Sequence, residues 1–344
     1  MKNTLFLLLS LSILTSCDDL LLGEEVANTP ENNFKSLWSE FDIRYGQFPI
    51  RGIDWDSVYT TNISRAQSTT SDEALYELMV EMLDPLNDGH VALIPIGTTL
   101  PDYHGGPIGK LDAMSDFELD VVKDNYLQEV KSSGDFFNYG YVANGIGYLH
   151  IEGFSDLAKF FEEPMNEVIS YFKNADGLII DVRGGYGGED VAGQYIAGYF
   201  MNEKRPYMIT KIKAGPEHQD FTDPVTWYVQ AEGDQQFLKP VVVLTHRFTI
   251  SARESFCLAM KVSPNVTFMG DTTAGAFSNQ INRELPNGWA YSLSIGDWRD
   301  ANNTSHEGIG LIPDVLVQNT REELLNGKDN VLEEAISFLE GKST

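Results

Sequence analysis

Hydrophobic positions change their spacing near residue 89, and this change divides the chain. From residue 30 to about residue 86, apolar side chains recur every three or four positions, as Phe34, Leu37, Phe41 and Tyr45 do. That spacing places them on one face of an α-helix. Thr70-Ser71-Asp72-Glu73 can cap a second amphipathic helix, because hydroxyl side chains at a helix start accept hydrogen bonds from free N–H groups. The pattern predicts a small helical subdomain at residues 31–88.

Beyond the turn sequence Asn87-Asp88-Gly89 the pattern changes to short strands and then to strands that alternate with helices. The expected strands are 91–96, 117–122, 139–142, 146–151, 177–182, 241–244 and 266–268. The expected helices are 160–172, 191–200 and 251–261. Such alternation is typical of an α/β protein with a twisted sheet and crossover helices. We therefore expect an α/β core over residues 89–344 that includes a β-rich segment near its start.

The first residues form a separate segment. Lys2 is followed by an apolar run over residues 5–14, which is too short for a membrane-spanning helix of about 20 residues and is typical of a secretory signal. Leu14-Thr15-Ser16-Cys17 resembles the bacterial lipobox, which implies a signal peptide at 1–16 and a lipid on Cys17. Residues 17–30 would form an acidic tether, and we expect the protein in the cell envelope, at the outer membrane or cell surface. The alternative is an ordinary signal peptide with an incidental cysteine.

Charge narrows the possible partners. The 344 residues include 24 Lys and Arg against 51 Asp and Glu, for a net charge of −27. A nucleic-acid backbone or an anionic membrane surface would be repelled, so we expect no nucleic-acid partner and membrane contact only through the lipid. The two cysteines, Cys17 and Cys257, provide no disulfide framework, and Cys257 is expected in the core.

A glycine-rich turn follows the expected strand at 177–182. It reads Asp181-Val182-Arg183-Gly184-Gly185-Tyr186-Gly187-Gly188, and such a turn lets successive N–H groups face an anion or an oxyanion. A dinucleotide site is disfavoured because Asp190 stands where the fingerprint needs its third glycine. Asp181 and Arg183 are expected to pair and hold the turn, although Arg183 facing a substrate carboxylate stays open.

Ser251 opens the expected helix at 251–261 and has two interpretations. With Glu254 it fits a capping box, which needs no catalysis. The start of a helix also stabilises developing negative charge, which suits a nucleophilic serine. The local sequence leaves both interpretations open.

Together, these segments resemble the tail-specific or C-terminal-processing serine protease family. Three further segments match in the same order, at 145–154, 270–275 and 307–314, and the resemblance covers roughly residues 86–317. It implies a ClpP/crotonase-like fold with Ser251 as the nucleophile. The backbone N–H groups of Ala252 and of Gly187 or Gly188 would form the oxyanion hole.

The resemblance to the tricorn-core and interphotoreceptor-retinoid-binding-protein-like branch supplies the base. The branch of bacterial processing enzymes has a catalytic lysine where this chain has Ala276. Asp88-Gly89-His90 resembles the branch's Asp-x-His element, which implies His90 as the base and Glu307 as the carboxylate that orients it. The branch has a bridging serine where this chain has Gly89. His246 is the rival base, and a turn histidine bonded to a carbonyl is the structural alternative for His90.

We therefore expect a lipid-anchored extracytoplasmic serine endopeptidase that cleaves peptides or proteins through an acyl-enzyme, without a metal or other cofactor. The stretch between His90 and Ile146 is too short for the PDZ domain of many relatives. If Glu189 and Asp190 line the cleft, we expect them to favour basic or neutral peptides. The alternative is a catalytically inactive lipoprotein that binds peptides or other ligands on the same fold.

Overall fold

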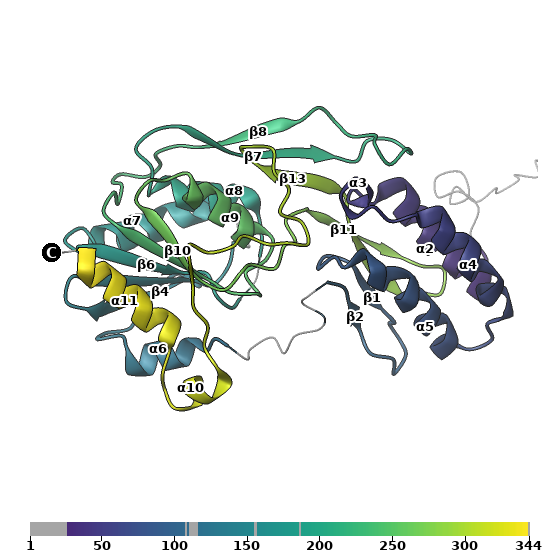
Figure 1. Cartoon of the computed structure of the whole chain (residues 1–344), viewed down its shortest axis with the longest axis horizontal. Helices are drawn as coiled ribbons and strands as arrows, with labels where there is room; N and C mark the ends of the chain where they lie inside the picture. The colour runs from purple at the N-terminus through teal and green to yellow at the C-terminus, as the bar shows by residue number, and fades with distance from the viewer. Residues whose placement is uncertain (1–25, 107–108, 110–115, 155–156, 186, 343–344) are drawn as a thin grey trace, which may run out of the picture.

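The computed structural model describes residues 26–106, 109, 116–154, 157–185 and 187–342, and Figure 1 shows them as two lobes. Its helices are α2 (Pro30–Arg44), α3 (Phe48–Arg51), α4 (Trp55–Ser68), α5 (Asp72–Leu83), η1 (Asp84–Leu86), α6 (Leu119–Asn125), η3 (Ala158–Phe161), α7 (Glu162–Tyr171), α8 (Asp190–Gly198), α9 (Ala252–Lys261), α10 (Arg321–Leu325) and α11 (Asn330–Lys342). Its strands are β1 (Ala92–Ile94), β2 (Tyr103–His104), β3 (Lys131–Ser133), β4 (Phe137–Ala143), β5 (Ile146–Ile151), β6 (Gly177–Asp181), β7 (Arg205–Ile212), β8 (Val225–Val229), β9 (Val241–Thr245), β10 (Val266–Gly270), β11 (Gln280–Glu284), β12 (Ala290–Ser294), β13 (Gly296–Asp300) and β14 (Val315–Leu316).

The larger lobe is built on a seven-stranded sheet with the order β14-β10-β9-β6-β5-β4-β3. The strands from β14 to β5 run parallel, and β4 and β3 add to one edge antiparallel. Helices α7, α8 and α9 lie in the connections between consecutive parallel strands. The predicted mixed α/β fold with crossover helices is therefore confirmed.

Successive residues of the central strands point to opposite faces of this sheet, and each face has its own core. Leu178 and Ile180 pack with α7, α8 and α9, where Cys257 is also buried. Ile179 and Val242 pack on the other face with α11 and α6, which Figure 1 shows next to each other at the lower left. Burial on both faces explains why β6 and β9 are continuous apolar runs.

The smaller lobe joins helices from the start of the chain to strands from a distant part of it. The aromatic face of α2 and the apolar face of α5 share one core with Trp289, Tyr291 and Leu293 of the β12 region. The four-stranded sheet has the order β11-β12-β1-β2. Because this core combines residues from both sides of residue 88, a division of the chain at that point stays a proposal.

A three-stranded ribbon of β7, β8 and β13 lies above both lobes (Figure 1). The loop that follows β7 reaches the smaller lobe, where His218 Nε2 lies 2.9 Å from Asp42 Oδ1 of α2. The His218 ring also stacks on Phe48, with ring centroids 4.3 Å apart. Through this loop the ribbon contacts the smaller lobe.

Two expectations from the sequence need comment. The strand expected at 117–122 is wrong, since Leu119–Asn125 forms α6 and Val122 faces the core beneath it. The signal peptide at 1–16, Cys17 and the tether up to residue 25 lie outside the described residues. Within the described part of the chain, no helix combines the length and the apolar character needed to cross a membrane.

Candidate active site

Ser251 stands between the end of β9 and the first turn of α9. Its backbone has φ 61° and ψ −129°, a region that non-glycine residues rarely adopt because the side chain crowds the backbone. Its N–H donates to the Ala276 carbonyl at 3.0 Å. Strained backbone at a helix start is typical of a functional position, and this geometry holds the Ser251 side chain against the neighbouring glycine turn.

Glu254 anchors the backbone around Ser251. Its buried carboxylate accepts hydrogen bonds from the Thr273 hydroxyl at 2.5 Å and from the N–H groups of Gly275 and Ala276 at 2.7 and 2.8 Å. The Ser251 N–H lies 3.3 Å from the same carboxylate. Burial raises the pKa of Glu254 to about 7, against the effect of these hydrogen bonds. The sequence indicated only the capping pair, and the contacts to the loop at 273–276 were not predicted.

The glycine turn leaves β6, which neighbours β9 in the sheet, so both segments end at the same edge. Gly184, Gly185 and Gly188 have φ values of 64°, 82° and 137°. A Cβ on Gly187 would lie 2.9 Å from Ser251 Cβ and 3.2 Å from its Oγ, so only glycine fits beside the serine without displacing it. The turn is thereby brought into contact with the serine.

Ala252 is the first residue of α9 and is buried. The N–H of a first helical residue has no partner within its helix. The three residues expected to form an oxyanion hole, Ala252, Gly187 and Gly188, thus flank Ser251 on its two sides, from the helix and from the turn. Their role in binding an oxyanion stays a prediction.

His246, the rival base, is instead part of the scaffold. Its Nε2 accepts the Gly184 N–H at 3.1 Å, and its Nδ1 lies 3.3 Å from the Thr249 hydroxyl. Burial, with the nearby Arg183 and Arg253 charges, holds the pKa of His246 well below its ordinary value. Both ring nitrogens are engaged, so the side chain fixes the glycine turn.

Arg183 pairs with two buried carboxylates. Its guanidinium bonds Asp181 at 2.7 Å and Asp329 at 2.8 Å, and it lies over the Phe117 ring at 4.5 Å. The predicted pairing with Asp181 is confirmed. Because Asp329 precedes α11, the same contacts attach the last helix to the base of the glycine turn.

His90 lies between η1 and β1, at the junction of the two lobes, and is 8 % exposed. Its backbone N–H donates to Asp88 Oδ1 at 2.8 Å, and its buried Nδ1 has no hydrogen-bond partner among the described residues. Burial lowers the pKa of His90, and the Asp88 charge opposes this effect. The lowered pKa favours the neutral ring, which is the form in which a histidine acts as a general base.

Glu307 is buried close to this histidine region but does not bond the ring. Its Oε1 accepts the N–H groups of Phe277 and Ser278 at 3.0 and 2.7 Å. Its Oε2 lies 3.8 Å from Arg51 Nη2 and has no hydrogen-bond partner within the described part of the chain. Burial, followed by the Asp88 charge, raises the pKa of Glu307 well above its usual range. No hydrogen bond between Glu307 and His90 occurs among the described residues, and the orienting role of Glu307 stays a prediction.

Residues from the helical subdomain contact the segment around His90 and Glu307. None of these contacts was predicted from the sequence. Tyr45 donates to Asp88 Oδ2 at 2.9 Å, Gln47 Nε2 lies 3.4 Å from Glu307 Oε1, and Arg51 donates to the Asn87 carbonyl at 2.8 Å. Only the Asp-x-His spacing pointed toward this region. The helices of the smaller lobe therefore position the histidine side of the candidate site.

Ser251 and His90 line one cavity of about 720 Å³, together with Gly187 and Gly188. No hydrogen bond joins Ser251 to His90 among the described residues. Catalytic hydrogen bonds are often looser before substrate binds. The other described residues that line it are both polar and apolar, and they come from the start of α8, the ribbon, the residue before Ser251 and the region where β11 begins: Glu189, Asp190, Val191, Thr210, Ile212, Trp227, Ile250, Phe277, Asn279, Gln280 and Trp298.

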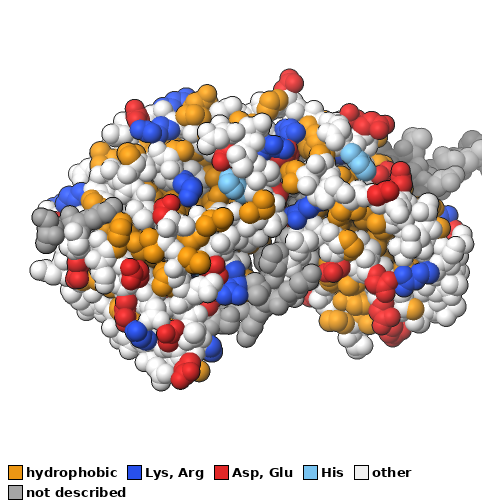
Figure 2. Space-filling model, in the orientation of Figure 1, with side chains coloured by type: hydrophobic (Ala, Val, Ile, Leu, Met, Phe, Trp, Pro, Cys, Tyr) orange, Lys and Arg blue, Asp and Glu red, His pale blue; other side chains and the backbone are white. Residues whose placement is uncertain are grey.

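The two acidic residues expected near the site, Glu189 and Asp190, also line this cavity. Asp190 accepts a hydrogen bond from Trp298 Nε1 at 3.0 Å, and burial raises its pKa. Glu189 is exposed. Acidic side chains also occur on both lobes of the face in Figure 2. Acidic residues at the cavity are therefore in keeping with the rest of this surface.

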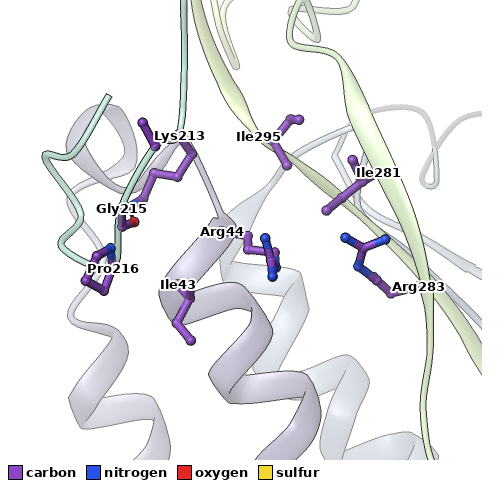
Figure 3. A pocket seen from close by; sticks show the side chains of 9 residues that line it. Ile43, Arg44, Lys213, Gly215, Pro216, Ile281, Arg283 and Ile295 are labelled. Atoms are coloured by element: carbon purple, nitrogen blue, oxygen red, sulfur yellow. Dashed lines mark hydrogen bonds between the residues drawn. The ribbon is translucent and has the colours of Figure 1, made fainter. Parts of the chain in front are cut away.

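A second pocket, of about 430 Å³, shares no lining residue with this cavity. Figure 3 shows it between helix α2, the loop after β7 and strand β11. The charged residues that line it are Arg44, Lys213 and Arg283. Among the described residues, no group of three His, Cys, Asp or Glu side chains is arranged to hold a metal ion.

Two family models match the chain. The model of peptidase family S41 matches residues 145–317, and the model of the tricorn protease C1 domain matches residues 27–84. The first range includes the glycine turn, Ser251 and Glu307. The second covers α2 to α5.

Individual relatives agree with these matches. The carboxy-terminal processing protease CtpA of Bacillus subtilis is 28% identical over 51% of this chain and 35% of its own length. A carboxyl-terminal-processing protease of Synechocystis is 25% identical over 50% of this chain and 38% of its own length. The chain thus spans little more than a third of these curated relatives.

Solved structures cover more of the chain. A candidate peptidase from Parabacteroides merdae is 31% identical with a TM-score of 0.81, covering 91% of this chain and 97% of the other. Mature CPAF has a TM-score of 0.69 at 12% identity, with 91% and 96% covered, which shows a shared fold.

Proposed function

The chain belongs to peptidase family S41, a family of serine peptidases, and from this membership and the geometry at Ser251 we propose that it is a serine endopeptidase acting on peptides or proteins. One observation carries the proposal. The strained Ser251, the glycine turn and His90 line a single cavity although they come from distant parts of the chain.

In the proposed acylation step, Ser251 Oγ attacks the carbonyl carbon of the scissile peptide bond while its proton passes to the His90 ring. The carbonyl oxygen becomes an oxyanion, and the N–H groups of Ala252 and of Gly187 or Gly188 stabilise it. The C–N bond then breaks, and the proton on His90 goes to the leaving amine. The product is an ester between the substrate's acyl group and Ser251.

In the proposed deacylation step, His90 takes a proton from a water molecule, whose oxygen attacks the ester. Collapse of the second tetrahedral intermediate releases the new carboxyl group and returns the proton to Ser251. His90 must approach Ser251 for both steps, and Glu307 would have to ionise and come close to the ring to stabilise the imidazolium that forms in each. This mechanism uses only groups of the chain and water.

We also propose that a lipid on Cys17 anchors the enzyme outside the cytoplasm, in the cell envelope. The support is the apolar run at 5–14 followed by Leu14-Thr15-Ser16-Cys17. The acidic residues that follow Cys17 would form the tether between the lipid and α2.

A second candidate function is ligand binding without hydrolysis. Its support is the His90 ring, whose Nδ1 is buried without a hydrogen-bond partner among the described residues, together with Gly89 in place of the bridging serine of the resembled branch. A base without an orienting partner transfers protons less effectively.

A fluorophosphonate probe distinguishes these functions, since it reacts only with an activated serine. We expect the protein beginning at Asp18 to be labelled, and Ser251→Ala to remove the label. His90→Ala should slow labelling by at least about a hundredfold, the usual contribution of general-base catalysis. Ser170→Ala, on the exposed face of α7, is the matched control and should label normally. An unlabelled but folded wild-type protein that cleaves no peptide from a mixed library would support the binding protein instead.

A further inference from the structure

Arg51 contacts both segments that carry the histidine side of the candidate site. It is the last residue of α3, and its side chain is only 9 % exposed. Its Nη1 donates to the Asn87 carbonyl at 2.8 Å, and its Nη2 lies 3.8 Å from Glu307 Oε2. One guanidinium therefore contacts the turn that leads into His90 and the carboxylate that is expected to act on this histidine.

The backbone of both segments is fixed where Arg51 contacts it. Asn87 has φ 47°, a left-handed conformation that asparagine tolerates better than most side chains, and the Arg51 hydrogen bond to its carbonyl holds this turn. Gly308 follows Glu307 and has φ 71°. A Cβ on Gly308 would collide with Arg51 Nη1. The backbone next to Glu307 thus approaches the guanidinium as closely as only glycine allows.

Glu307 is buried among other acidic groups. Burial has the largest effect on its pKa and raises it, and the charges of Asp88, before β1, and Glu254, in α9, act in the same direction. The hydrogen bond from the Ser278 N–H and the Arg51 charge lower the pKa of Glu307. Ionisation of this carboxyl group therefore depends on the guanidinium that balances the neighbouring carboxylates.

The other titratable groups near Glu307 do not supply this positive charge. Tyr45, at the end of α2, is neutral because burial raises its pKa well above the ordinary value. His306 precedes Glu307 in the chain, but its Nε2 lies 3.2 Å from Asp300 Oδ2 on β13. Burial lowers the pKa of His90, which favours its neutral ring. Within the described part of the chain, the positive charge that contacts Glu307 thus comes from α3.

Building on the proposed function, we infer that Arg51 is a positioning residue of the active site. Its guanidinium holds the turn before His90 and the Glu307 segment in one arrangement. It also supplies the charge against which Glu307 ionises when the His90 ring takes up the serine proton. The smaller lobe therefore acts on the reaction through one cation that does not contact the reacting atoms.

The first test follows the titration of Glu307 itself by NMR. Glutamate is labelled with a carbon isotope at its carboxyl group, and the Glu307 signal is identified by its loss in Glu307→Gln. We expect the titration midpoint to rise in Arg51→Gln by about one pH unit or more, the usual effect of removing an adjacent guanidinium from a carboxyl group. Urea unfolding verifies that each variant is folded. A midpoint that stays in place overturns the inference.

The second test is the pH dependence of fluorophosphonate labelling. Because Glu307 must be ionised to stabilise the imidazolium, the rate falls as pH drops through the pKa of Glu307. In Arg51→Gln this fall should begin at a pH about one unit higher. In the Glu307→Gln background, Arg51→Gln should cause no such shift. Equal profiles for wild type and Arg51→Gln, or an equal shift in both backgrounds, overturn the inference.

Arg51→Lys separates the charge from the geometry. Lysine keeps the positive charge but lacks the planar fork that reaches the Asn87 carbonyl and Glu307 together. We expect a titration midpoint of Glu307 close to that of wild type, with labelling slower by about ten- to a hundredfold, as a displaced catalytic group would cause. Labelling at the wild-type rate would overturn the positioning role.

Arg65→Gln is the matched control, because it removes one positive charge from the smaller lobe at a half-exposed side chain of α4. It should change neither the Glu307 midpoint nor the labelling profile. Failure of the wild-type protein to label would overturn the proposed hydrolysis. The NMR midpoint decides on Arg51 whether or not the protein is labelled, so the two failures are distinguishable.

Discussion

The backbone of Gly187 lies so close to Ser251 that there is no room for a side chain between them. A methyl group there would come within 3.2 Å of Ser251 Oγ, so Gly187→Ala must displace either the serine or the turn. We expect fluorophosphonate labelling to slow by about a hundredfold or more, the usual effect of losing one oxyanion donor. Gly341→Ala in α11, whose added methyl group meets nothing within 4 Å, should label at the wild-type rate. Equal rates for both variants would contradict the role of the turn.

Glu254 makes the stability of the site depend on pH. Its folded-state pKa of about 7 lies above the ordinary 4.5, so the folded protein keeps a proton that the unfolded chain releases between these values. This contribution to the free energy of unfolding is complete below about pH 4.5 and is lost as pH rises through 7.

Glu254→Gln cannot titrate and serves as the comparison for urea unfolding. We expect the difference in unfolding free energy between wild type and Glu254→Gln to change across pH 4.5 to 7, with wild type losing stability relative to the variant. A difference that stays constant over this range would show that Glu254 ionises as an ordinary glutamate.

The C-terminal helix is held through one buried charge network. Asp329→Ala would leave the Arg183 guanidinium with only Asp181 and remove an acceptor from the Leu332 N–H. Loss of one partner from a buried ion pair costs about 3–5 kcal/mol, measurable as a lower urea midpoint. Asp120→Ala, on the exposed side of α6, should leave the midpoint nearly unchanged, and an equally small effect for Asp329→Ala would contradict this account.

The ribbon is held to the smaller lobe by few contacts. His218→Ala removes both the 2.9 Å contact with Asp42 and the stacking on Phe48. Because both partners are about one-third exposed, we expect global stability to fall by less than about 1 kcal/mol. Hydrogen exchange in residues 213–222 should nevertheless become faster, and unchanged exchange there would show that other contacts hold the loop.

At the scale of elements, the sequence predicted best where periodicity is strong and burial is complete. Strands β5, β6 and β9 and helices α8 and α9 were expected close to their observed bounds, since each has a continuous apolar run or a clear helical face. The segment at 117–122 was misassigned as a strand because Phe117, Leu119 and Val121 occupy every second position. A window this short does not separate the two-residue period of a strand from the period of a helix. The packing of Val122 against the sheet stabilises the helical conformation of this segment.

The ribbon and the small sheet were not predicted because their pairing is distant. Strand β13 pairs with β7, and β1 pairs with β12, so these pairings join segments that lie far apart in the sequence. Ser251, the glycine turn and His90 could be identified from motifs. The residues around them could not be identified in this way, because no motif in their own segments indicates a site. Examples are Gln47, Arg51, Trp227 and Trp298.

At the scale of the whole molecule, the expected anchor can be tested separately from the fold. Cys17→Ser removes the acceptor of the proposed lipid, and we expect the protein to move from the membrane fraction to the aqueous fraction after cell lysis. Asp18→Ser, which changes the neighbouring residue, is the matched control and should stay with the membrane. Continued membrane recovery of Cys17→Ser would count against lipid anchoring.

The division of the candidate site between the two lobes has a consequence for how the protein is made. His90 is synthesised early, but the strand β12 that pairs with β1 and the Glu307 segment follow Ser251 in the chain. A growing chain that has just produced the serine therefore lacks the small sheet that seats the histidine. The candidate site would therefore be complete only once nearly all of the chain has left the ribosome and the two lobes have come together.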